Sequence, residues 1–137
     1  MKGSCFCETV QFSITGSTPD LYQCHCSECR KTTGVSANAG FIISEKQLEW
    51  LKGQDNIKTY IKDSGYRVDF CKTCGSVVPS PASVKPEMMW IPAGLLDNPP
   101  VMKVGNHLFV GSKASWDEIQ GSANQHENLP PSIDFLL

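Results

Sequence analysis

Seven cysteines in three short clusters constrain this chain more than any other feature. The clusters are Cys5-Phe6-Cys7, Cys24-His25-Cys26-Ser27-Glu28-Cys29 and Cys71-Lys72-Thr73-Cys74. A structural zinc site usually has four protein ligands, whereas a catalytic site has three and keeps one position for water or substrate. Seven cysteines divide naturally into four plus three. The spacing therefore predicts one closed and one open zinc site.

The first and third clusters form the predicted closed site. Two residues separate Cys71 from Cys74, which lets both sulfurs face one ion, and Gly75 suits the positive φ of such a turn. Cys5 and Cys7 can supply the other two ligands and would close a long loop. Structural zinc contributes on the order of 10–16 kcal/mol in small peptides, and a domain is stable by only about 5–15 kcal/mol. Loss of this site should therefore threaten folding.

The central cluster is the predicted open site. Cys24, Cys26 and Cys29 lie within six residues, so they can take one face of a zinc ion and leave the other free. His25 points away from them if the chain is extended there, and it becomes a fourth ligand only if the backbone bends. An all-sulfur shell suits a sulfur substrate, which favours a thiol in the fourth position.

Other interpretations of the cysteines stay open. One zinc ion can use four of them while the remaining three are buried as small hydrophobic residues. Redox-active thiols or disulfides are a further alternative, although the odd number of cysteines argues against complete pairing. At the level of function, the alternatives to an enzyme are a non-enzymatic zinc scaffold that binds a partner and a thiol redox or scavenging protein without turnover.

Composition limits the class of protein. We expect one domain over residues 1–137, with 40% hydrophobic and 19% charged residues, as in an ordinary globular protein. No apolar run approaches the roughly 20 residues of a membrane helix, and the N-terminus lacks the apolar core of a secretory signal. The expected location is the cytoplasm, where thiols stay reduced. A net charge of −2 argues against nucleic-acid binding.

Short runs of alternating apolar and polar residues predict a β-rich or all-β fold. We expect strands over 10–14, 41–43, 48–51, 57–61, 66–70, 88–93 and 107–110, with 57–61 and 66–70 forming a hairpin. One helical turn over 26–33 should end at Gly34, and the tail over 121–137 should be mostly irregular. Arg67 and the Arg30-Lys31 pair are interpreted as solvated, and His107 as a core histidine with a hydrogen-bond partner.

Three ordered motifs carry a resemblance to a known family. They are Gly3-x-Cys5-x-Cys7-x-x-Val10-x-Phe12, Cys24-His25-Cys26-x-x-Cys29-Arg30-Lys31-x-x-Gly34 and Phe70-Cys71-x-x-Cys74-Gly75-Ser76. Together with later segments, they make residues 3 to 120 resemble the glutathione-dependent formaldehyde-activating enzymes, a family that also includes centromere protein V. The resemblance implies a tent-like fold of short antiparallel strands with zinc knuckles and few short helices.

The resemblance also implies ligands and an activity. It assigns Cys5, Cys7, Cys71 and Cys74 to a structural zinc ion. It assigns Cys24, Cys26 and Cys29 to a catalytic zinc ion. The implied activity is that of a carbon–sulfur lyase, which joins glutathione to formaldehyde as S-hydroxymethylglutathione. The thiol and aldehyde used, the general acid–base, a possible homodimer and the zinc occupancy of the three-cysteine site stay open.

Two departures from the family pattern bear on function. Glu8 stands where the family usually has glycine, which questions the turn after Cys7. The segment after Gly75 is rich in proline, with Pro79-Ser80-Pro81 and Lys85-Pro86. If that segment borders the pocket, the substrate can differ from that of the founding enzyme, because a shared fold does not fix the substrate.

Overall fold

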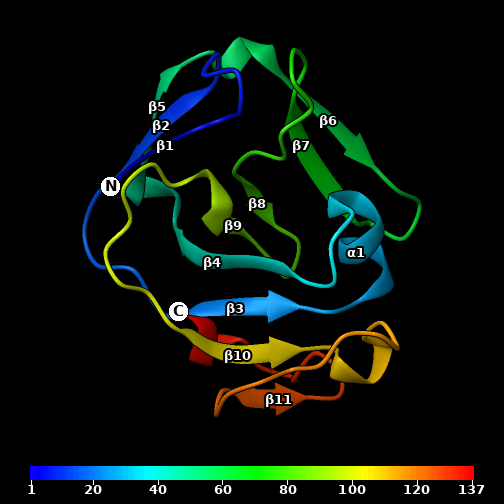
Figure 1. Ribbon diagram of the computed structural model, residues 1–137. Coiled ribbons are helices and arrows are strands. Elements are labelled where there is room, and N and C mark those ends of the chain that lie inside the picture. Colours follow the sequence, from blue (N-terminus) through cyan, green and yellow to red (C-terminus); the bar gives the residue numbers. More distant parts are fainter.

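Short strands dominate the fold because β-branched and aromatic residues alternate with polar ones along much of the chain. The computed structural model describes residues 1–137 (Figure 1). The strands are β1 (Lys2–Ser4), β2 (Gln11–Ile14), β3 (Leu21–Cys24), β4 (Asn38–Ser44), β5 (Leu48–Lys52), β6 (Ile57–Ile61), β7 (Arg67–Cys71), β8 (Ser80–Ala82), β9 (Lys85–Pro92), β10 (Val104–Leu108) and β11 (Asn124–His126). The one α-helix is α1 (Ser27–Thr33). The 3-10 turns are η1 (Glu45–Gln47), η2 (Gln54–Asn56), η3 (Ala93–Leu95), η4 (Val110–Ser112) and η5 (Asp134–Leu136).

The strands form three sheets. One has the order β1-β2-β5, the largest has the order β11-β10-β3-β4-β9-β8, and β6 pairs with β7 as a hairpin. Figure 1 shows the three-stranded sheet and the hairpin on one side of the six-stranded sheet, with α1 between the hairpin and β3. Most pairings are antiparallel, as expected, but β10 runs parallel to both β3 and β11. The β-rich class with a single short helix is confirmed.

The core lies on both faces of β4. Phe41 and Ile43 join one cluster, and Ile42 between them joins another. A strand that is buried on both faces carries a continuous apolar run, which explains the sequence of this segment. The second cluster includes Ile133 and Leu136, so the C-terminal tail packs against the six-stranded sheet.

The helical turn occurs where the sequence predicts it. The Cys26 sulfur caps α1 by accepting a hydrogen bond from the Cys29 backbone N–H at 3.3 Å. The helix ends at Gly34, whose φ of 72° lies in the left-handed region that glycine tolerates. Ser27 to Thr33 therefore make a short helix fixed at both ends, and this helix positions the central cysteine cluster.

Each predicted strand overlaps an observed one, but the strand predicted over 107–110 begins at Val104 and ends at Leu108, because Phe109 has a left-handed backbone and Val110 starts η4. Four strands are absent from the expected set: β1, β8 and β11 have only three residues each, too few to show alternation, and β3 has four. The tail is less irregular than expected because it contains β11 and η5. None of the helices combines the length and the hydrophobicity required to cross a membrane.

Candidate metal centres and the adjoining cavity

Four cysteines from distant segments meet in the first cluster. Cys5 and Cys7 lie between β1 and β2, Cys71 is the last residue of β7, and Cys74 follows in the next turn. All four sulfurs lie within 4.8 Å of one another. The Cys5–Cys7 and Cys7–Cys71 sulfur distances are 3.6 and 3.8 Å. Tetrahedral zinc with Zn–S bonds of about 2.3 Å places its sulfurs about 3.8 Å apart, so this donor set fits zinc.

The surroundings of the four-cysteine cluster lower the pKa of Cys71 and Cys74 and raise that of Cys5. The Val10 backbone N–H donates to the Cys5 sulfur and the Asn56 amide to the Cys71 sulfur, both at 3.3 Å. Burial opposes ionisation of Cys74, but hydrogen bonds from the side chain and backbone of Ser76 outweigh it and lower the pKa of Cys74 to about 6. Burial raises the pKa of Cys5 to about 11, so a cation is needed to deprotonate it at neutral pH.

Glu8 forms the turn after Cys7, where this sequence departs from the family pattern. Glu8 has a φ of 60°, in the left-handed region that favours glycine. Its backbone N–H donates to the Cys5 carbonyl at 2.8 Å, which closes the turn. Glu8 is therefore in a strained turn, and Cys5 and Cys7 still lie in one cluster with Cys71 and Cys74. Gly75 has the positive φ, 77°, that the sequence predicts.

The second cluster comes from one continuous segment. Cys24 ends β3, Cys26 caps α1, and Cys29 lies in its first turns. The three sulfurs lie within 4.8 Å of one another, which also fits one face of a zinc ion. The thiols of Cys24 and Cys29, together with backbone N–H groups of α1, face the Cys26 sulfur and lower its pKa. Cys26 is thus the thiol of this cluster that ionises most readily.

His25 points away from the three sulfurs, as the alternation predicts. Its Nδ1 lies 3.0 Å from Asp117 Oδ2, and its Nε2 lies 3.0 Å from His107 Nδ1. Both histidines are buried, and burial together with the neighbouring His25 lowers the pKa of His107. His107 is a core histidine with a hydrogen-bond partner, as predicted. The contacts of His25 with Asp117 and His107 hold the segment between Cys24 and Cys26 on the side away from the sulfurs.

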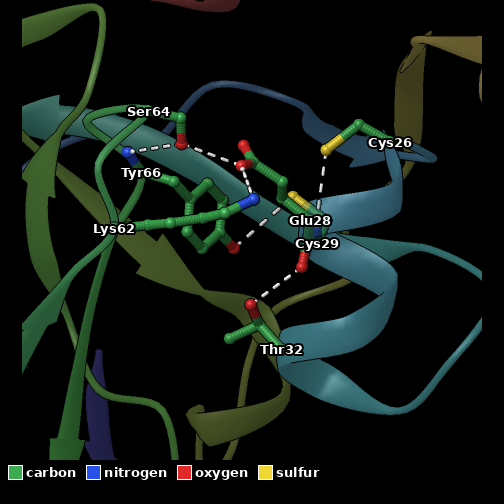
Figure 2. A network of polar contacts seen from close by, with 7 residues as sticks. All are labelled: Cys26, Glu28, Cys29, Thr32, Lys62, Ser64 and Tyr66. Atoms are coloured by element: carbon green, nitrogen blue, oxygen red, sulfur yellow. Dashed lines mark hydrogen bonds and ion pairs between the residues drawn. The ribbon is translucent and has the colours of Figure 1, made fainter.

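The β6–β7 hairpin contacts the three-cysteine cluster through a residue that sequence reasoning missed (Figure 2). The Tyr66 hydroxyl donates to the Cys29 sulfur at 3.7 Å. Lys62 and Ser64 reach the same Glu28 carboxylate oxygen at 2.9 and 2.8 Å, which ties the hairpin to α1. Tyr66 precedes β7 as one of several alternating apolar residues, so nothing in the sequence distinguishes it from a packing residue.

A cavity of about 240 Å³ adjoins this cluster. Cys24, Cys26 and Cys29 form part of its wall, with Tyr22 and Tyr66 beside them. Burial raises the pKa of both tyrosines, so their hydroxyls stay protonated at neutral pH. The three sulfurs therefore face a space that a small ligand can enter, whereas none of the four sulfurs of the other cluster lines this cavity.

Two arginines interpreted as solvated are held by the protein instead. Arg67 lines the cavity and makes two hydrogen bonds of 2.9 Å to Asp69. Arg30 donates to the backbone carbonyls of His25 and Ser112 at 3.4 and 3.1 Å. Both guanidinium groups therefore bind protein groups near the site, and neither is without a protein partner.

Comparisons with known proteins agree with this geometry. The profile of the family described as glutathione-dependent formaldehyde-activating enzyme matches residues 1–112. Among solved structures, the chain is similar to a Rhodobacter sphaeroides protein from a structural genomics programme, with a TM-score of 0.62 and 23% identity over 73% of this chain and 91% of that one. That likeness concerns the fold alone. A search of curated proteins found no match. The family profile spans most of the chain and both cysteine clusters, so the protein belongs to the glutathione-dependent formaldehyde-activating enzyme family.

Proposed function

We propose that this protein is a zinc-dependent carbon–sulfur lyase that joins a thiol to an aldehyde and reverses that reaction. The observation that carries the proposal is that Cys24, Cys26 and Cys29 form one wall of a cavity. Family membership supports glutathione and formaldehyde as the first substrates to test.

The donor chemistry supports two zinc ions with different tasks. Cys5, Cys7, Cys71 and Cys74 would hold a structural ion, and Cys24, Cys26 and Cys29 would hold a second one at the cavity. Zinc bound by three thiolates supplies a Lewis acid that lowers the pKa of a thiol and polarises a carbonyl oxygen. A site with three ligands from one short segment is expected to lose its ion more readily than the closed site.

The reaction needs one proton transfer. A sulfur–carbon bond forms, the π electrons of the carbonyl move to its oxygen, and the proton that leaves the thiol ends on that oxygen. With glutathione and formaldehyde the product is S-hydroxymethylglutathione. The Tyr66 hydroxyl lines the cavity beside Cys29, and burial keeps its pKa above the ordinary value. We assign Tyr66 the role of proton donor to the aldehyde oxygen, after which it takes up the proton that the thiol released, so that one proton moves in net terms; in the reverse direction it accepts that proton.

Exchange NMR on mixtures of glutathione and formaldehyde tests the function. The zinc-loaded protein should speed exchange between glutathione and its adduct beyond the uncatalysed rate, which a sample without protein measures. Cys29→Ser should abolish the acceleration. Tyr66→Phe should reduce it about 100-fold, the low end for a general acid. Wild type and both variants equal to the sample without protein would contradict the proposal.

Two further expectations belong to the same proposal. All seven cysteines are free thiols, which suits the reducing cytoplasm. We propose that residues 1–137 act as one domain there, because the tail packs Ile133 and Leu136 beside Ile42 and Leu108. A small thiol is then the partner, with no role for nucleic acid or membrane. Cell fractionation and limited proteolysis test the location and the domain.

A further inference from the structure

We propose that the cavity selects thiols, and their aldehyde adducts, that carry an uncharged apolar group next to the sulfur. This inference rests on the proposed function, because it takes the three-cysteine cluster as the place where the thiol sulfur binds. Glutathione carries two carboxylates and one ammonium group, so it falls outside the substrate class that we infer.

The charges around the cavity support this choice. Apart from the cysteines and tyrosines, the ionisable lining residues are Glu28 and Arg67. Arg67 is paired with Asp69 through two contacts of 2.9 Å, and Glu28 is paired with Lys62 at 2.9 Å. The cavity wall therefore offers no unpaired cation to a carboxylate. A carboxylate that loses its water there without a partner raises the free energy of binding.

The proline-rich segment supplies one apolar wall. Pro81 and Ala82 of β8 line the cavity, followed by Val84 in the next turn. The indole of Trp90, on the neighbouring strand β9, also lines it. The proline-rich segment that departs from the family pattern thus borders the pocket. The sequence predicts that the substrate can differ from that of the founding enzyme when this is so.

The C-terminal tail supplies a second apolar wall. Leu129, Ile133 and Leu136 line the cavity, and all three lie beyond residue 112, where the family match ends. Ile133 and Leu136 are also buried in the cluster formed with Ile42 and Leu108. Part of the pocket is therefore built by residues outside the matched region, so the family's activity does not determine its specificity.

Phe109 adds a backbone observation that points to the same surface. Its φ and ψ of 58° and 40° lie in the left-handed region, which is unfavourable for a bulky residue. Phe109 lines the cavity. Strained backbone in a folded protein gathers at binding sites, where the surrounding structure holds it in place. The strain supports Phe109 as a fixed apolar contact for the ligand.

Size limits the apolar group. The cavity of about 240 Å³ is smaller than the roughly 300–1,000 Å³ of pockets that enclose drug-sized ligands. A short alkyl chain or a single ring beside the sulfur fits that space better than a tripeptide. The expected ligands are therefore small alkyl or benzyl thiols and the hemithioacetals that they form with aldehydes.

A titration with matched thiols tests the inference. The zinc-loaded protein, with labelled methyl groups, is titrated with 1-butanethiol, 3-mercaptopropionate and glutathione. The first two have similar size and differ in the carboxylate. We expect 1-butanethiol to bind at least about 10-fold more tightly than either anionic thiol, which corresponds to roughly 1.4 kcal/mol. The methyl signals of Leu129, Ile133 and Leu136 should shift with it.

Two variants place a cation at the cavity wall. Val84→Lys changes a residue that is 50% exposed, so the fold should tolerate it. Leu129→Lys adds a cation to the cavity wall from the tail. Each should tighten 3-mercaptopropionate severalfold and weaken 1-butanethiol. Val101→Lys is the matched control, because it adds the same charge at a fully exposed residue outside this cavity. It should leave both affinities unchanged.

The outcomes separate the inference from the proposed function. Equal or tighter binding of glutathione would overturn the apolar selection and leave the proposed function standing. Preference for 1-butanethiol, without acceleration of the exchange of either 1-butanethiol or glutathione with its formaldehyde adduct, would support the selection and overturn the enzyme. If no thiol shifts the cavity methyl signals, both are wrong.

Discussion

The two cysteine clusters have the same ligand chemistry and opposite constructions. The four-cysteine cluster joins segments that are 64 residues apart, whereas the three-cysteine cluster comes from one strand end and the following helix. Two sulfurs of the first accept hydrogen bonds from protein donors, and the second lines a cavity. The difference teaches that the number of sulfurs alone does not decide the task of a cluster: what faces the sulfurs decides it.

The β6–β7 hairpin connects the two clusters. Cys71 at the end of β7 belongs to the four-cysteine cluster, and Tyr66 just before β7 contacts the three-cysteine cluster. Folding of the hairpin therefore depends on one cluster and positions a residue at the other. The predictions below test whether the clusters divide the work of stability and function in this way.

The largest expected effect is on stability at the closed cluster. Cys71→Ser removes a fully buried sulfur of the cluster that joins the hairpin to the N-terminal segment, and with it one of the four proposed zinc ligands. Because structural zinc contributes on the order of 10–16 kcal/mol and a domain is stable by about 5–15 kcal/mol, most of the protein should unfold. Thermal melts and zinc analysis measure this. A variant that melts like wild type and keeps two zinc ions would break the comparison.

The next effect separates function from folding. Cys29→Ser should leave a folded protein that carries one zinc ion fewer and has no activity, because its cluster is local in sequence and joins no distant segments. Circular dichroism, zinc analysis and the exchange assay measure the three properties. If Cys29→Ser and Cys71→Ser unfold to the same extent, the three-cysteine cluster is structural as well.

A smaller effect concerns the strained turn at the closed cluster. Glu8→Gly should stabilise the protein by about 0.5–1 kcal/mol, because the left-handed conformation costs a residue with a Cβ roughly 1–2 kcal/mol, partly offset by the entropy of glycine. Glu8→Ala keeps the Cβ and loses the carboxylate, so it should show no such gain. Denaturant unfolding measures both. Equal stabilisation by the two variants would attribute the effect to charge instead.

The smallest effect concerns the ion pair that ties the hairpin to α1. Hydrogen bonds from Lys62 and Ser64 lower the pKa of Glu28 in the folded state. A lowered carboxyl pKa stabilises the protein above the unfolded pKa of about 4.3, and this contribution is lost as the pH falls through the folded value. Glu28→Gln should therefore lower the melting temperature slightly at pH 7 and not at pH 2. Equal differences at both pH values would contradict the pairing.

The sequence by itself determined the division of the cysteines into two groups and the fold class. The spacing of the cysteines predicts the four-plus-three division because two or three sulfurs close in the chain can face one ion only from a turn or a helix start. Alternation predicts most strands and the direction of His25, since side chains in extended backbone point to opposite sides. The glycine at the end of α1 and the φ of Gly75 follow from local steric limits.

Only the tertiary structure decided what surrounds the open cluster. Tyr66 reaches Cys29 from 37 residues away, and Leu129 and Ile133 reach the cavity from the tail. Arg67 looked solvated although its partner Asp69 lies two residues along the same strand, and the cavity that Arg67 borders is formed by segments that this strand does not contain. Contacts between distant segments depend on how sheets pack, and packing has no signature in a short stretch of sequence. The spacing of cysteines within each motif is therefore local information, whereas the walls around the three-cysteine cluster are set by the packing of distant segments.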